Sequence, residues 1–208
     1  MTFTVGKGGR KLSEYPCFID FEASGLGNRS YPIEVGWNLP DGTVRSFLIR
    51  PLPSWNHWCE RAEAVHGISR AELLADGVSV EAICARLCRD MQGWEIYEDG
   101  GLFDREWLGQ LLVAGGCPSP IFQVCDCCAW LFFPDMPLPK KKALQEQAWK
   151  IAGRRHRAGN DVRWFLEWLR LGREAGYRDD VPGSRFLAKT EAKKDGILNE
   201  NRNLVGKP

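Results

Sequence analysis

Residues 17–27 read Cys-Phe-Ile-Asp-Phe-Glu-Ala-Ser-Gly-Leu-Gly. The apolar, β-prone run from Cys17 predicts a buried strand that stops at the glycines. Residues two apart in a strand point to the same side, so Asp20 and Glu22 would present two carboxylates on one face. Free charges are costly within an apolar run, and divalent cations are their usual partners. The alternative is a solvated strand end, because about one D-x-E is expected by chance in a chain this long.

The rest of the chain predicts a mixture of strands and helices. Two further strands are expected over 31–38 and 43–50, with turn residues at 40–42 between them. Apolar residues at helical spacing predict a helix from Val80 to Met91. Other helices are expected over 54–64, 69–74, 103–113, 141–152 and 158–172, with short strands at 96–97 and 121–124 and a proline-rich loop at 134–140. This order favours an α/β class with a mixed central sheet flanked by helices.

Composition limits the domain organisation and the kinds of partner. The 208 residues are 44% hydrophobic and 26% charged, which excludes wholesale disorder and suits one domain. We expect a flexible leader at 1–15, the domain at 16–175 and a polar extension at 176–208. The 28 Lys and Arg against 27 Asp and Glu exclude a strongly basic coat, so phosphate contacts must be local. Without a membrane span or secretory signal, we expect a cytoplasmic protein.

The eight cysteines are interpreted as reduced thiols rather than disulfides. Cys117 and the Cys125-Asp126-Cys127-Cys128 stretch suggest a metal site, but they lack paired C-x-x-C knuckles and a nearby histidine. Buried or idle thiols are therefore favoured over a structural zinc site.

Two more acidic positions stand out before helical segments. Asp104 follows Leu102-Phe103 and opens a predicted helix, where the helix dipole alone can explain an acid. His156 and Asp161 would lie about 140° apart if both were helical. They can converge if His156 lies in the entering loop with Asp161 one turn into the helix. A capped helix start is the alternative.

Four segments occur in an order that resembles a known family. They are Phe18-Ile19-Asp20-Phe21-Glu22-Ala23-Ser24-Gly25-Leu26, Glu63-Ala64-Val65-His66-Gly67-Ile68-Ser69, Phe103-Asp104-Arg105-Glu106-Trp107-Leu108 and His156-Arg157-Ala158-Gly159-Asn160-Asp161. Together, over about residues 16–172, they resemble the DEDD superfamily of 3′–5′ exonucleases. The H-x4-D spacing is similar to that of its DEDDh branch, which includes polymerase proofreading subunits, ribonuclease T and oligoribonuclease.

The resemblance implies a ribonuclease-H-like fold that uses two divalent cations, Mg²⁺ or Mn²⁺, to remove nucleotides from a 3′ end. It implies that Asp20, Glu22, Asp104 and Asp161 are the metal-centre carboxylates and that His156 is the general base. It also implies contacts to the terminal nucleotide from Ala23, Ser24, Gly25, Leu26, His66, Phe103 and Arg157. Among these, Leu26 would be an apolar wedge and Arg157 a phosphate contact. For His66, a core or capping role remains equally open.

The resulting hypothesis is a hydrolase that releases nucleoside 5′-monophosphates from single-stranded or frayed 3′ ends, with DNA favoured over RNA. An exoribonuclease and a non-catalytic nucleic-acid or polymerase-binding module are the alternatives, and a homodimer or a polymerase partner stays open. The chain departs from many relatives at 98–101, where Glu-Asp-Gly-Gly replaces a polar Asn or Ser. These extra acids either tune the metal site or cap the helix that follows.

Overall fold

A computed structural model describes residues 15–117, 119–120, 122–126 and 132–179. The expected leader and polar extension therefore lie almost wholly outside the described residues, as do Cys127 and Cys128. Within the described ranges, no helix combines the length and apolar character that crossing a membrane requires.

Among the described residues, five strands form one mixed sheet in the order β3-β2-β1-β4-β5. They are β1 (Cys17–Ala23), β2 (Pro32–Asn38), β3 (Val44–Leu48), β4 (Glu95–Glu98) and β5 (Gln123–Asp126). The first three strands pair antiparallel, whereas β4 lies parallel to β1 and β5 parallel to β4. The three strands expected at the start of the domain and the mixed α/β sheet are confirmed.

Six helices occur in the part of the chain that the structure describes. They are α1 (Glu60–His66), α2 (Arg70–Asp76), α3 (Val80–Met91), α4 (Leu102–Ala114), α5 (Leu138–Ala152) and α6 (Ala158–Glu174). The prediction of α3 is confirmed over its full length. Ser69 caps α2, because its hydroxyl oxygen accepts the Glu72 backbone N–H at 3.1 Å.

Two sequence predictions about helix starts are wrong. The helix expected from residue 54 begins only at Glu60, because the Cys59 backbone N–H donates to the Ser24 carbonyl at 2.9 Å and ties this segment to the end of β1. The loop expected over 134–140 ends earlier, since α5 begins at Leu138. Pro139 then lies in the first helical turn, where a missing backbone N–H costs nothing.

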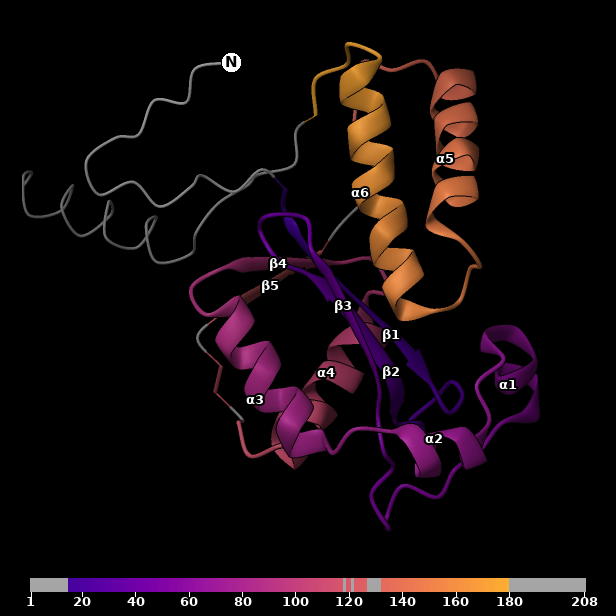
Figure 1. Ribbon diagram of the computed structural model, residues 1–208, viewed down its shortest axis with the longest axis vertical. Coiled ribbons are helices and arrows are strands. Elements are labelled where there is room, and N and C mark those ends of the chain that lie inside the picture. The colour runs from indigo at the N-terminus through magenta and orange to yellow at the C-terminus, as the bar shows by residue number, and fades with distance from the viewer. Residues whose placement is uncertain (1–14, 118, 121, 127–131, 180–208) are drawn as a thin grey trace, which may run out of the picture.

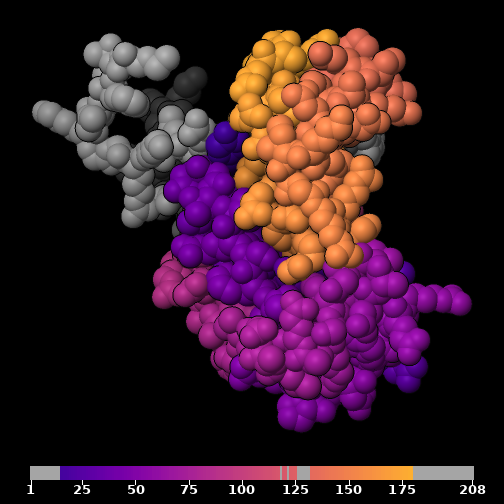
Figure 2. Space-filling model, turned by 45° about the vertical axis from the view of Figure 1, so that its right-hand side comes forward, coloured from indigo at the N-terminus to yellow at the C-terminus, as the bar shows by residue number. Residues whose placement is uncertain are grey.

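Helices cover both faces of the sheet, and β1 shows which residues face which layer (Figure 1). Cys17, Ile19 and Phe21 pack into the core formed with α3 and α4. Phe18 points the other way and joins the core formed with α5 and α6, which lie side by side along one flank of the strands (Figure 2). Because side chains alternate, Asp20 and Glu22 continue the face of Phe18, toward the start of α6.

Candidate functional site

The structure brings the four predicted carboxylates and His156 together at the end of β1. Ligand atoms of Glu22, His156 and Asp161 lie within 4.8 Å of one another. Those of Asp20, Asp99 and Asp104 form a second group within the same limit. These residues come from three separate segments of the chain, at 20–22, 99–104 and 156–161, so their convergence is a property of the fold.

Asp99 is one of the two acids for which the sequence left a choice between tuning the metal site and capping the following helix. It directly follows β4, which is parallel to β1, and the carboxyl ends of parallel neighbours meet at the same edge of a sheet. Its neighbour Glu98 has the other role that was considered. Glu98 accepts the Gly101 backbone N–H at 2.7 Å and the Arg105 Nε at 2.9 Å, so it holds the first turn of α4.

Asp104 lies in the first turn of α4 and is only 4% exposed. One of its carboxylate oxygens accepts the Gly100 backbone N–H at 3.2 Å. A Cβ at Gly100 would lie 2.4 Å from that carboxylate, so this close approach requires glycine. The backbone contact and the helix N-terminus both favour the charged form of Asp104.

His156 lies in the loop before α6, and Asp161 lies in the first turn of that helix. This is the arrangement in which the two side chains can converge. His156 has a φ of 59°, in the left-handed region that histidine adopts more readily than most residues. Its side chain is exposed, so water can reach the imidazole beside Glu22 and Asp161.

An ion pair anchors the start of α6 on β2. The Glu34 carboxylate is 3% exposed and accepts Arg157 Nε at 3.0 Å and Nη2 at 2.9 Å. It also accepts the backbone N–H of Ala158 at 3.0 Å. Arg157, expected to contact phosphate, thus has its forked face on Glu34. Phosphate contact by Arg157 stays a prediction, and its structural contact with Glu34 is what the sequence missed.

Burial and mutual repulsion raise the pKa values of the clustered acids. The pKa of Asp20 lies well above its usual range, first because the carboxyl is buried and then because of the charges of Asp104 and Asp161. Burial and Asp161 raise the pKa of Glu22 to about 8. Burial also raises the pKa of Asp104 and of Asp161 to about 7 in each case, with Asp99 adding repulsion. Without a counter-ion, this site therefore retains protons near neutral pH.

The donor set fits hard divalent cations. Asp20 Oδ2 and Asp161 Oδ1 are buried, and neither has a hydrogen-bond partner among the described residues. Buried carboxylate oxygens without partners are costly, and a cation would satisfy them. Five carboxylates and one imidazole favour Mg²⁺ or Mn²⁺ over a thiophilic metal.

A cavity of about 560 Å³ opens beside this centre. Its lining includes Glu22, Ala23, Gly25, Leu26 and His156. Leu26 is 73% exposed, as an apolar wedge for a nucleobase would need to be. Gly25 is buried against His57, and a Cβ there would lie 2.7 Å from its ring, so the backbone packs directly on the histidine.

Ser24 does not offer a free hydroxyl to this cavity. It is 1% exposed, and its Oγ accepts the Tyr31 backbone N–H at 3.2 Å and lies 3.4 Å from His57 Nδ1. We therefore interpret Ser24 as a residue that holds the β1–β2 connection in shape. The expected polar contact of Ser24 with a nucleotide stays untested.

His66 and Phe103 border the site differently. His66 is 2% exposed, and its Nδ1 accepts the Ile68 backbone N–H at 3.0 Å, which leaves Nε2 as the protonated nitrogen of the neutral ring. That Nε2 is buried without a partner in the described chain, and His66 lines the cavity. Both the capping and the substrate-contact interpretations thus retain support. Phe103 is 41% exposed and stacks on Trp107 at 5.7 Å between ring centroids.

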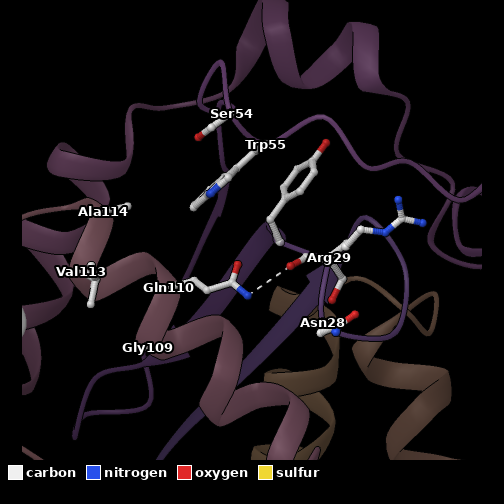
Figure 3. Close-up of a pocket in the computed structure, with 10 residues that line it drawn as sticks. Asn28, Arg29, Ser54, Trp55, Gly109, Gln110, Val113 and Ala114 are labelled. Atoms are coloured by element: carbon white, nitrogen blue, oxygen red, sulfur yellow. Dashed lines mark hydrogen bonds between the residues drawn. The ribbon is translucent and has the colours of Figure 1, made fainter.

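A second cavity, of about 480 Å³, lies between α4 and the β1–β2 connection (Figure 3). Gln110 extends from α4 and donates to the Ser30 carbonyl at 3.1 Å, and Trp55 faces it across the cavity (Figure 3). Trp107 Nε1 donates to Ser30 Oγ at 2.9 Å, and Trp107 also lines the first cavity. The hydrogen bond between Trp107 and Ser30 therefore joins a residue that lines the first cavity to a residue that lines the second.

The sheet order and the acidic residues at the end of the central strand define a ribonuclease-H-like fold. Among solved structures, the chain is similar to Escherichia coli exonuclease I in complex with a dT13 oligonucleotide, with a TM-score of 0.57 and 17% identity over 76% of this chain and 40% of that one. It is also similar to exonuclease I from Methylocaldum szegediense, with a TM-score of 0.55 and 18% identity over the same shares. At these identities the likeness shows the fold alone.

A zinc-bound E. coli exonuclease I complex with single-stranded DNA gives a TM-score of 0.53 and 17% identity. The match covers about 40% of the length of each of these proteins. No protein-family model matches the sequence, and no curated protein matches it.

Proposed function

We propose that this chain is a metal-dependent 3′–5′ exonuclease that removes nucleotides from single-stranded or frayed 3′ ends of DNA. The observation that carries the proposal is the convergence of Asp20, Glu22, Asp99, Asp104 and Asp161 with His156 in two ligand groups. The raised pKa values of these acids and the unpartnered oxygens of Asp20 and Asp161 support a cation-binding role.

The residues have separable tasks in this proposal. The carboxylates of Asp20, Glu22, Asp104 and Asp161, with Asp99 beside them, would hold two divalent cations. When bound, two cations stabilise the attacking and the leaving oxygens of an in-line phosphodiester displacement. His156 accepts the proton of the attacking water, because its exposed imidazole lies beside Glu22 and Asp161 and a neutral imidazole nitrogen can act as a general base.

The cavity supports the proposal that the site takes a chain end. Its volume of about 560 Å³ suits one nucleotide, and the exposed Leu26 would pack against the terminal base. An apolar wedge does not distinguish bases by hydrogen bonds, so we expect little sequence preference. A net charge of +1 supports a contact of only a few nucleotides.

DNA is favoured over RNA as the substrate. Two of the similar solved structures are complexes of exonuclease I with dT13 and dA16 oligonucleotides. The exoribonuclease alternative rests on the resemblance to ribonuclease T and oligoribonuclease. The complete acid set argues against a non-catalytic binding module, which would have no need of it.

The test is a digestion panel of single-stranded DNA, mismatched duplex DNA, RNA and dinucleotides, with Mg²⁺, Mn²⁺ or chelator. Asp20→Asn should remove activity, whereas Asp76→Asn on exposed α2 is the matched control. His156→Asn keeps a residue that tolerates the left-handed backbone but removes the imidazole, so it should lose rate more than metal affinity. Wild-type digestion by Asp20→Asn would contradict the proposal, and faster digestion of RNA than DNA would establish the alternative.

A further inference from the structure

Three thiols meet at the far end of α4 from the acidic site. Cys84 and Cys88 lie one turn apart on the same face of α3, and Cys117 follows the end of α4. Their Sγ atoms all lie within 4.8 Å of one another, and those of Cys88 and Cys117 are 2.9 Å apart. Cys84 and Cys88 belong to the apolar stripe that predicted α3, whereas Cys117 was considered in the sequence only together with the 125–128 stretch.

The turn after α4 fixes Cys117 against α3. The Gly115 N–H donates to the Leu111 carbonyl and the Cys117 N–H to the Leu112 carbonyl, both at 2.8 Å. Gly116 adopts a φ of 76°, which glycine accepts without strain. A Cβ at Gly115 would lie 2.3 Å from Cys84 Cβ, so the backbone of this turn packs directly on that cysteine. The three sulfurs are therefore held together by backbone geometry.

The cluster is partly open to solvent. Cys84 is buried, whereas Cys88 and Cys117 are half-buried, so an ion or water has a route to the sulfurs. Burial raises the pKa values of the Cys84 and Cys88 thiols, which keeps them protonated when no cation is present. The 2.9 Å between Cys88 and Cys117 exceeds the ~2.05 Å of a disulfide bond.

We propose that Cys84, Cys88 and Cys117 form a thiolate site for a borderline or soft divalent cation such as Zn²⁺, with water in the fourth position. Sulfurs bound at ~2.3 Å in tetrahedral geometry lie ~3.8 Å apart, so the Cys88 and Cys117 sulfurs need to separate by only ~1 Å. Each thiol that binds loses its proton to solvent. Hard cations such as Mg²⁺ prefer oxygen ligands, so the acidic centre and this site select different metals.

Such a site would fasten the C-terminal end of α4 to α3. Because α4 carries Asp104 in its first turn, a cation bound by the three cysteines would restrict the movement of the helix that completes the acidic centre. The proposal does not depend on the exonuclease function, since its ligands are separate from the acids.

The experiment is a Cd²⁺ titration of the full chain, kept reduced by a phosphine. Cadmium gives an ultraviolet charge-transfer band with thiolates and none with carboxylates, so the acidic centre stays silent. We expect one equivalent to produce the band and to raise the melting temperature. Cys117→Ser and Cys84→Ser should each weaken binding at least tenfold, whereas Cys59→Ser should leave it unchanged.

A second measurement covers the case in which Cys84→Ser fails to fold. Alkylation of the wild-type chain, followed by peptide mapping, should show that Cd²⁺ protects Cys84, Cys88 and Cys117 but not Cys59. The absence of a band, a band that persists in Cys117→Ser, or protection confined to other cysteines would overturn the proposal.

Discussion

Gly36 in β2 faces the backbone of Ala158 at the start of α6 so closely that a Cβ at position 36 would lie 2.5 Å from the Ala158 carbonyl carbon and oxygen. This contact lets the helix N-terminus rest on the sheet without a side chain between them. It therefore sets how far Asp161, in the first turn of α6, stands from Glu22 in the adjacent strand.

Gly36→Ala should consequently displace the start of α6 and separate the two ligand groups. We expect a loss of stability of about 1–3 kcal/mol, as for other overpacked sites, together with a clear loss of nuclease activity. Gly109→Ala in α4 is the matched control, because a Cβ there meets nothing within 4 Å and alanine favours helix by about 0.5–1 kcal/mol. Thermal melts and digestion rates measure both effects. Equal behaviour of the two variants would contradict this account.

The Glu34–Arg157 pair should act mainly on stability. Glu34→Gln leaves a half-buried guanidinium without its anion and should cost about 1–3 kcal/mol in chemical denaturation. Arg157→Lys should also destabilise the fold, since lysine cannot span both carboxylate oxygens. Arg170→Lys, in an exposed pair on the same helix, should have little effect. If Arg157→Lys raises KM at an unchanged melting temperature, phosphate contact is its main role.

The metal-free protein should lose stability as the pH rises. The folded-state pKa values of Glu22, at about 8, and of Asp104 and Asp161, at about 7, lie above those of the unfolded chain near 4. The folded state thus binds more protons between these limits, and the stability present below about pH 4 is lost as the pH rises through 7 to 8. Thermal melts in chelator should show this fall, at about 2–4 °C for each kcal/mol.

Mn²⁺ should restore the melting temperature most strongly at the alkaline end of that range. Asp161→Asn should flatten the pH profile and stabilise the metal-free chain at about pH 8, because it removes one of the repelling charges. A melting temperature that rises with pH in chelator would show that the acids are not mutually repelling.

Asp99→Asn tests the acid that sequence reasoning left undecided. Because its carboxylate lies with those of Asp20 and Asp104, we expect a rate loss of about 10–100-fold at limiting metal, as for outer partners of metal ligands. Excess metal should restore part of the rate that Asp99→Asn loses. It should restore none of the rate that Asp20→Asn loses. Metal titrations of activity measure the difference. A wild-type metal requirement in Asp99→Asn would remove this residue from the centre.

Leu26→Ala should affect the substrate and leave the fold unchanged. The side chain is 73% exposed, so its loss should alter the free energy of unfolding by less than about 0.5 kcal/mol. We expect weaker binding of single-stranded DNA and slower digestion. Leu74→Ala, which truncates a 54% exposed leucine on α2, provides the comparison. The wedge assignment fails if both variants digest DNA alike.

Local patterns predicted the elements that carry the site. The alternation in β1 predicted that Asp20 and Glu22 share a face, and the apolar stripes predicted α3 and α6. His156 and Asp161 were expected to converge only if the histidine lies in the loop before the helix, and the structure places it there.

Apart from the early start of α5, the features that were missed depend on long-range contacts. Arg157 finds Glu34 from 123 residues away, and no local pattern records that pairing. To place Asp99 in the centre, one had to know the register in which β4 pairs with β1. The four-residue β4 is too short for the sequence to predict that register. The late start of α1 arises because the Ser24 carbonyl holds the Cys59 backbone N–H, a contact between two loops.

The acids of the centre are supplied by β1 near one end of the domain and by α6 near the other. A nascent chain that ends at α5 would carry Asp20, Glu22, Asp99 and Asp104 without His156 and Asp161, which complete the group around Glu22. The two ligand groups would therefore be complete only once α6 has been synthesised and has docked on the sheet.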